Sequence, residues 1–352
     1  MSVTREQVLA VLAGFAAPGG GTIASRDIVR VLAVEGGAVR FVLEAESPEA
    51  TRALEVLRPE IEAKLRALPG VTSVSIATST ATAAPPSLKI GGHPKPQTGP
   101  KPIAGVARVL AVGSGKGGVG KSTVASNLAV ALARAGRKVG LLDADIYGPS
   151  QPRMMGVNRR PASPDGKTII PIVAHGVTMM SIGLMLNDGE AVIWRGPMLM
   201  GAIQQMLEQV AWGELDVLIV DLPPGTGDVQ LSLAQKVPVS GALVVSTPQD
   251  VALIDARRAL SMFSKLGVPV VGLIENMSTY VCPNCGHEAH LFGHGGVATE
   301  AKGLGLPFLG ELPLDLSVRL AGDAGTPIAA GDGPVAQAYA RLAASLIKTG
   351  SA

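Results

Sequence analysis

A glycine-rich segment, Gly113-Ser-Gly-Lys-Gly-Gly-Val-Gly-Lys-Ser-Thr123, lies between a short apolar run, Arg108–Val112, and a helical run, Val124–Ala135. Its GxxxxGKS spacing over residues 115–122 is the pattern of a loop that wraps phosphates between a strand and a helix. Glycines let successive backbone N–H groups turn inward, and the helix N-terminus adds the positive end of its dipole. The segment therefore predicts a nucleotide-phosphate site.

Each residue type in this loop has an expected task. We expect Lys121 to reach the β- and γ-phosphates, the Ser122 hydroxyl to bind Mg²⁺, and Thr123 to lie near the α-phosphate. The alternative is a glycine-rich turn that only starts a helix. The residues expected to contact the nucleotide are Gly115, Lys116, Gly117, Gly118, Val119, Gly120, Lys121, Ser122 and Thr123.

Two acidic positions follow buried apolar runs. Asp143-Ala-Asp145 ends the run 139–142, where ligand sites gather in open α/β sheets. Asp221 ends the run 217–220, the placement in which a carboxylate holds Mg²⁺ through its water shell. The glycines in residues 223–228 indicate a switch loop after Asp221. These acids could instead be solvated loop residues.

The apolar runs also indicate the fold class. Residues 108–112, 139–142, 217–220, 242–245 and 270–274 are short apolar runs separated by helical stretches. Strands buried on both faces that alternate with helices form a doubly wound, mostly parallel α/β sheet. Before it, residues 1–78 predict a small α/β domain of order α-β-β-α-β, whose second helix either kinks or splits at Pro59. Residues 79–102 contain six prolines, three lysines and no acid, and predict a flexible linker to a domain over 103–352.

The only two cysteines form the knuckle Cys282-Pro-Asn-Cys285-Gly286, a pattern that holds zinc or an iron-sulfur cluster. A four-thiolate centre needs two such pairs, so the simplest closure is a cluster shared across the twofold axis of a homodimer. Alternatives are a Cys₂His₂ zinc site with His287 and His290, a redox pair, or two inert thiols. A reducing compartment disfavours a structural disulfide.

Composition limits the possible partners. The 352 residues are 47% hydrophobic and 16% charged, with a net charge of only +2, which predicts a globular chain without a nucleic-acid or membrane footprint. Charges, glycines or prolines interrupt every long apolar run before it reaches the length of a bilayer span. No export signal is visible after Met1, so we expect the cytoplasm.

These motifs together resemble the Mrp/ApbC family of Fe–S cluster carrier ATPases, a deviant Walker-A group of P-loop NTPases, from residue 103 to the C-terminus. The residues that support this resemblance are Gly113–Thr123, Asp143–Ser150, Asp221–Asp228 and Cys282–Cys285. Residues 1–78 resemble the small domain of Fe–S assembly factors. Some relatives of that domain have a cysteine of their own, which is absent here.

The resemblance implies an ATP-dependent carrier that takes a cluster, expected to be [4Fe–4S], from assembly scaffolds to apo-proteins. It implies that Lys116 reaches nucleotide across a dimer interface, that Asp145 lies near Mg²⁺ and the attacking water, and that Asn276 holds adenine. A guanine-specific Asn-Lys-x-Asp string is absent, which also favours ATP. Asn276 could instead cap the next turn, and Lys116 could instead be a solvated loop lysine. Two other functions stay open: a partition or positioning switch ATPase, and a zinc or nickel insertion NTPase.

Overall fold

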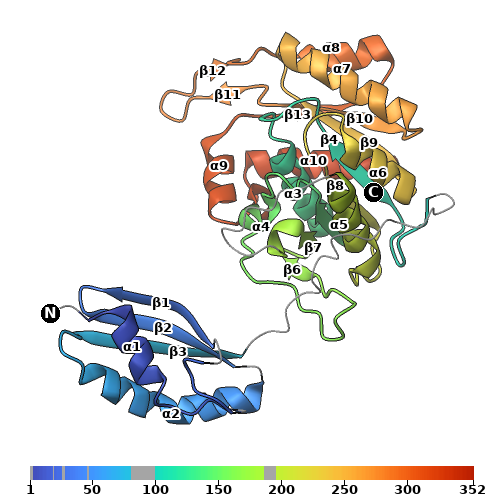
Figure 1. Ribbon diagram of the computed structural model, residues 1–352. Coiled ribbons are helices and arrows are strands. Elements are labelled where there is room, and N and C mark those ends of the chain that lie inside the picture. The colour runs from blue at the N-terminus through green and yellow to red at the C-terminus, as the bar shows by residue number, and fades with distance from the viewer. Residues whose placement is uncertain (1–2, 19, 26–27, 46, 81–99, 186–195) are drawn as a thin grey trace. The chain divides into compact units, whose positions relative to one another are not determined.

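The computed structural model describes the whole chain except residues 1–2, 19, 26–27, 46, 81–99 and 186–195 (Figure 1). The chain divides into two compact units, Met1–Ala84 and Pro85–Ala352. Most of the predicted linker, residues 79–102, falls on 81–99 and so lies outside the described residues. The exact domain bounds remain a prediction.

The N-terminal unit has the predicted α-β-β-α-β order. Its elements are α1 (Arg5–Leu12), β1 (Val29–Glu35), β2 (Ala38–Ala45), α2 (Pro48–Arg66) and β3 (Ser73–Thr80). β1 and β2 pair antiparallel and β2 and β3 pair parallel, while α2 packs on β2 and β3. Ser47 caps α2, and Leu54, Ile61 and Leu65 anchor it in the core. α2 runs as a single helix through Pro59, so of the two predicted alternatives, a kink or a split, the structure excludes the split.

The second unit is built on one twisted sheet. Within the described residues, eight strands follow the order β13-β10-β9-β4-β8-β5-β7-β6, all parallel except β6 against β7. The strands are β4 (Val109–Gly113), β5 (Val139–Asp143), β6 (Ile172–Ala174), β7 (Val177–Ser181), β8 (Val217–Asp221), β9 (Gly241–Ser246), β10 (Val270–Asn276) and β13 (Phe308–Leu312). The predicted α/β fold class is confirmed.

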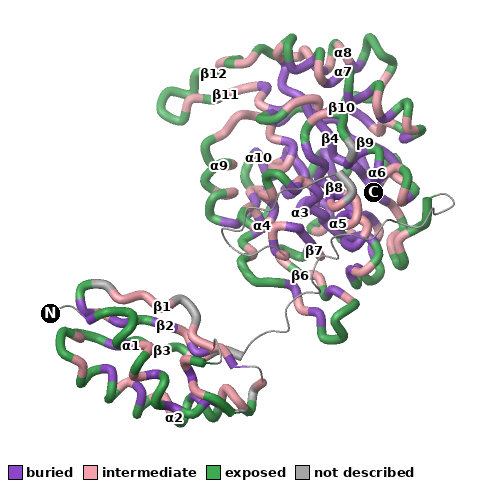
Figure 2. Tube along the Cα trace, in the orientation of Figure 1, coloured by how far each residue is buried: buried purple, intermediate pink, exposed green. Residues whose placement is uncertain are grey.

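Helices cover both faces of this sheet, as Figures 1 and 2 show. Alternate residues of β4 enter different cores: Leu110 and Val112 face one, Val109 and Ala111 the other. The helices are α3 (Lys121–Arg134), α4 (Gln151–Met154), α5 (Gly196–Gln209), α6 (Asp228–Lys236), α7 (Asp250–Lys265), α8 (Gly296–Leu304), α9 (Leu316–Asp323) and α10 (Pro334–Lys348). Helices α3 and α10 pack together on the first face, and α5 to α8 supply the second.

The C-terminal helix α10 packs against the sheet through its apolar face. Leu342 and Leu346 are buried in the core that α10 shares with α3, and Ile347 packs at its margin. Among the described helices, none combines the length and apolarity required to cross a bilayer.

Candidate functional site: a phosphate loop and a cysteine hairpin

The glycine-rich loop leaves β4 and enters α3 at the carboxyl edge of the sheet. Gly118 and Gly120 have φ of +82° and +81°, a left-handed conformation that side chains with a Cβ disfavour. A Cβ on Gly115 would collide with the backbone of Asp255 in α7. The glycines thus permit both the turn of the loop and its close seating on α7.

Lys121 and Asp221 form a buried ion pair, with side-chain exposures of 6% and 0%. Lys121 begins α3 and Asp221 ends β8, so the glycine-rich loop and the predicted Mg²⁺-binding acid meet although they are 100 positions apart in the chain. The Lys121 ammonium also donates to the Ser122 hydroxyl at 3.1 Å. The structure therefore brings together a cation, a hydroxyl and a carboxylate, the groups that bind phosphate and Mg²⁺. These donors fit a Mg-nucleotide.

Gln151, which the sequence analysis did not single out, ties these elements together. Its side-chain amide donates to Asp221 Oδ2 at 2.8 Å and to the Ser122 carbonyl at 2.9 Å, and its backbone N–H donates to Asp143 Oδ2 at 3.1 Å. The Gln151 side-chain oxygen is buried without a hydrogen-bond partner in the described structure. Gln151 therefore positions both carboxylates, Asp221 through its buried side-chain amide and Asp143 through its backbone N–H.

The two acids after β5 differ in environment. Asp143 is fully buried, and desolvation, followed by repulsion from Asp221, raises its pKa to about 7 despite hydrogen bonds from Ser181, Gln151 and Asp145. Asp145 is half-buried; desolvation raises its pKa, which Lys121 lowers and Asp221 raises again. Lys121 and Asp221 thus lie near enough to Asp145 to influence its charge.

The raised pKa of Asp143 should make stability fall with pH. Since the folded pKa of about 7 exceeds the unfolded value, the folded protein retains a proton between about pH 4 and pH 7 that the unfolded chain has lost. Asp143→Asn removes this titration. Relative to the variant, wild type should lose up to about 1.4 kcal/mol of unfolding free energy per pH unit in this window. Urea denaturation without nucleotide, at several pH values, measures the difference.

Asp165→Asn is the matched control, because Asp165 is exposed and hydrogen bonds from Thr168 and Lys167 lower its pKa to about 2. The stability of Asp165→Asn should follow that of wild type in parallel above about pH 5, where the unfolded Asp165 has also lost its proton. Parallel curves for wild type and Asp143→Asn would show that Asp143 does not titrate in this window.

Asn276 ends β10 and contacts the phosphate loop directly. Its side-chain N–H donates to the Val119 carbonyl at 2.9 Å, and a Cβ on Gly120 would overlap that amide nitrogen. The same asparagine lines a pocket of about 380 Å³. Other residues of the pocket are Gly120, Thr123, Met154, Pro313 and Tyr339. A pocket that opens from the loop has the right place to receive the part of a nucleotide beyond its phosphates.

Lys116 is the second lysine of the loop and is half-buried. The Ser114 hydroxyl donates to its backbone carbonyl at 3.0 Å, and the Ser114 carbonyl accepts from Gly225 N–H at 3.0 Å. Gly225 lies in the predicted switch loop. The loop that carries Lys116 is therefore joined by a backbone hydrogen bond to the segment after Asp221.

The two cysteines lie in a small hairpin formed by β11 (Tyr280–Val281) and β12 (Glu288–Ala289). Gly286, at φ +70°, donates its N–H to the Cys282 carbonyl at 2.9 Å and closes the turn. Hydrogen bonds to the Cys282 sulfur from the backbone of Cys285 and Asn284, and then from the Cys285 thiol, lower the pKa of Cys282. The hairpin therefore brings both thiols together and favours the thiolate form that binds metals.

The alternative Cys₂His₂ site is not assembled in this structure. His290 Nδ1 lies 3.1 Å from the Ser278 carbonyl, and its Nε2 lies 3.8 Å from Glu288. Among the described residues, the only group of three or more possible ligands whose donor atoms lie within 4.8 Å of one another is Glu275, His294 and Glu311. His287 and His290 do not join Cys282 and Cys285 in such a group.

The sheet order, the GKS loop and the Lys121–Asp221 pair define a P-loop NTPase. The sequence model of the NUBPL iron-transfer P-loop NTPase family matches residues 105–347. The chain therefore belongs to that family, in agreement with the resemblance seen in its sequence. A second model, described as an iron-sulfur cluster assembly protein, matches residues 5–76.

Individual relatives agree with this assignment. An iron-sulfur cluster carrier protein of Pseudomonas fragi is 52% identical over 245 residues, covering 68% of this chain and 85% of the relative. One from Synechocystis is 46% identical over 307 residues, covering 86% and 84% respectively. A nucleotide-binding protein of Archaeoglobus fulgidus, solved with ADP, is 39% identical with a TM-score of 0.56, covering 63% of this chain and 88% of that protein.

Proposed function

We propose that the protein binds and slowly hydrolyses ATP in order to carry an iron-sulfur cluster. Lys121 neutralises charge on the β- and γ-phosphates, the backbone of Gly115–Gly120 donates to phosphate oxygens, and Thr123 lies near the α-phosphate. The ADP in the Archaeoglobus relative supports an adenine nucleotide in the same pocket. Asn276, which lines that pocket, is the side chain proposed to read the base.

Ser122 and Asp221 would hold Mg²⁺, Ser122 directly and Asp221 through water. Since Lys121 pairs with Asp221 in this structure, the lysine must exchange that carboxylate for phosphate when nucleotide binds. Gln151 keeps Asp221 oriented during the exchange because it also holds the Ser122 carbonyl. Asp145, with a raised pKa, orients the attacking water. Lys116 acts across a homodimer interface as a second cation for the phosphates.

The cargo is a [4Fe–4S] cluster held by Cys282 and Cys285 of two subunits. The supporting observation is a hairpin that places both thiols together and directs backbone N–H groups at the Cys282 sulfur, in the same unit as the nucleotide loop. One chain supplies two thiolates and the cluster takes four, so two chains share one cluster. The names of the relatives support transfer to apo-proteins. We place the protein in the cytoplasm, receiving clusters from assembly scaffolds.

Anaerobic purification or reconstitution, followed by iron, sulfide and visible-absorption measurements, tests this function. Equal iron and sulfide, with one cluster per dimer and a broad visible band, is the expected result. Stoichiometric zinc or nickel without sulfide would instead identify a metal-insertion NTPase. ATP-dependent binding to DNA or vesicles by an iron-free protein would identify a positioning switch.

A further inference from the structure

Two carboxylates lie side by side on adjacent strands at the edge of the sheet. Glu275 on β10 and Glu311 on β13 are register partners in the parallel β10–β13 pair. Like charges placed directly opposite each other on neighbouring strands repel and destabilise the sheet. The pair therefore calls for a positive charge between the two side chains.

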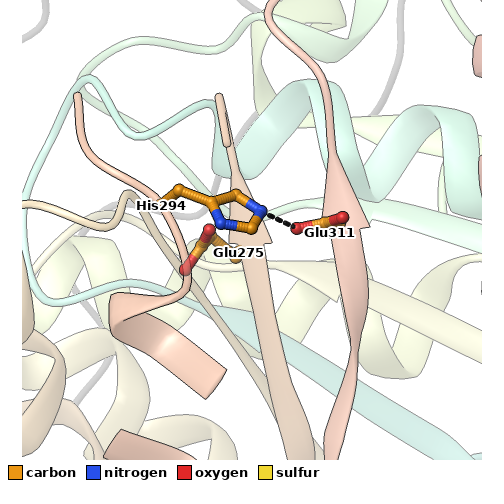
Figure 3. Close-up of side chains that lie close together, drawn as sticks. All are labelled: Glu275, His294 and Glu311. Carbon is orange, nitrogen blue, oxygen red and sulfur yellow. Dashed lines mark hydrogen bonds and ion pairs between the residues drawn. The ribbon is translucent and has the colours of Figure 1, made fainter. Parts of the chain in front are cut away.

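His294 lies between these carboxylates, as Figure 3 shows, with Nε2 2.9 Å from Glu311 Oε2. Gly293 and Gly295 flank it with φ of +90° and +73°, so the loop can bring the imidazole over the strand ends. One donor atom from each of Glu275, His294 and Glu311 lies within 4.8 Å of the others. Three elements, β10, the loop before α8 and β13, thus converge on one small volume.

Glu275 is fixed in position by the start of α8. Its side chain is fully buried, and its two oxygens accept backbone N–H groups from Gly295 and Val297, both at 2.9 Å. Each carboxylate oxygen has a second lone pair, so these hydrogen bonds leave acceptor capacity for a cation. His294 and Glu311 have side-chain exposures of 45% and 51%, which gives an ion access from solvent.

We propose that Glu275, His294 and Glu311 form a binding site for one first-row divalent metal ion of the Zn²⁺, Fe²⁺ or Mn²⁺ type. Two carboxylates and a neutral imidazole carry a net charge of −2, which such an ion neutralises. The imidazole ligand disfavours Mg²⁺ and Ca²⁺, and the lack of sulfur disfavours Cu(I). Three protein ligands leave one or more coordination positions for water, as in open metal sites.

This site contains neither the thiols nor a residue of the phosphate loop, but one contact links it to each. Glu275 precedes Asn276, which holds the Val119 carbonyl of the loop. The His294 ring packs on His290, just after the cysteine hairpin, with centroids 4.5 Å apart. A bound ion would therefore join β10 and β13 to the segment between the hairpin and α8. The competing explanation is that a proton on His294 alone bridges the two carboxylates.

Titration with Co²⁺ separates these possibilities. The full-length Cys282→Ser/Cys285→Ser variant, free of nucleotide and Mg²⁺, should bind one Co²⁺ per chain and develop ligand-field bands without thiolate charge transfer. Added Zn²⁺ should displace the Co²⁺. Adding His294→Ala, which removes the imidazole ligand, or Glu311→Gln, which replaces an anionic carboxylate with a neutral amide, should weaken Co²⁺ binding at least about ten-fold. Both residues are exposed, so neither change should unfold the protein.

His287→Ala, a change at an exposed histidine outside the three ligands, is the control and should leave Co²⁺ affinity unchanged. Failure of the cysteine-free variant to bind Co²⁺, or affinity that is indifferent to His294→Ala, would overturn the site. A pH-dependent melting shift that requires His294 but no metal would assign the histidine as a protonated bridge instead. None of these results depends on whether the thiols carry a cluster.

Discussion

ATP turnover by Lys121→Ala is expected to fall at least about a hundred-fold, the loss typical when a cation or donor to developing negative charge is removed. Lys121 is almost fully buried beside Ser122 and Asp221, where low dielectric makes its charge count for more than it would in water. Initial rates of phosphate release at saturating Mg-ATP measure the effect. Lys138→Ala changes an exposed lysine outside the phosphate loop. It is the matched control and should hydrolyse ATP at the wild-type rate.

The loss of rate must be distinguished from loss of structure. Lys121→Ala leaves Asp221 buried without its partner, and breaking a buried pair from one side costs about 3–5 kcal/mol. The double variant Lys121→Ala/Asp221→Asn removes the unpaired charge and should recover much of this stability without recovering turnover. Wild-type turnover by folded Lys121→Ala would contradict the assignment of the phosphate loop.

The main features of the fold and the loop could be predicted because their signals are local. A buried strand, a GKS loop and a helix follow one another within residues 109–134, so spacing alone indicates the chemistry. The same holds for Cys282 and Cys285, which lie within four consecutive residues of one turn. The predicted strands do not include β6, β7 or β13. Ile172–Ala174 has only three residues, and the sequences of β7 (Val177–Ser181) and β13 (Phe308–Leu312) mix apolar residues with polar residues or glycine, so none stands out from a loop.

The sequence alone does not identify side chains whose contacts depend on the order of the strands in the sheet. Gln151 becomes informative only when β5 and β8 are known to be neighbours, because its partners Asp143 and Asp221 are then adjacent. Glu275 and Glu311 are likewise 36 positions apart and meet through the β10–β13 register. In the sequence, Glu275 and Glu311 look like ordinary polar residues near strand ends, and Gln151 looks like an ordinary residue at a helix start. Their contacts in the folded chain, not their residue types, identify them as candidate functional residues.

Loss of cluster binding at the cysteine hairpin should leave nucleotide binding at the phosphate loop intact. Cys282→Ser or Cys285→Ser replaces a thiolate with a poor ligand, so iron content after reconstitution should fall at least about ten-fold. The loss should be similar for both variants, although Cys282 is half-buried with N–H groups at its sulfur and Cys285 is exposed. ATP binding should persist, because the change alters no residue of the loop. Asn284→Ala keeps both thiols and both backbone donors, and serves as the control.

Stoichiometry decides whether two subunits share the cluster. Size-exclusion chromatography with iron counting should give a wild-type dimer with one cluster. Cys285→Ser protein should contain no iron, and a smaller fraction of it should be dimeric, because a bound cluster no longer stabilises the dimer. Mixing wild-type and Cys285→Ser chains adds a sharper measure. If four thiolates are required, a mixed dimer offers only three and should lose its cluster faster on exposure to a chelator than the wild-type dimer. A monomer that carries a complete cluster, or Cys285→Ser protein with undiminished iron, would contradict the shared arrangement and point to ligands within one chain.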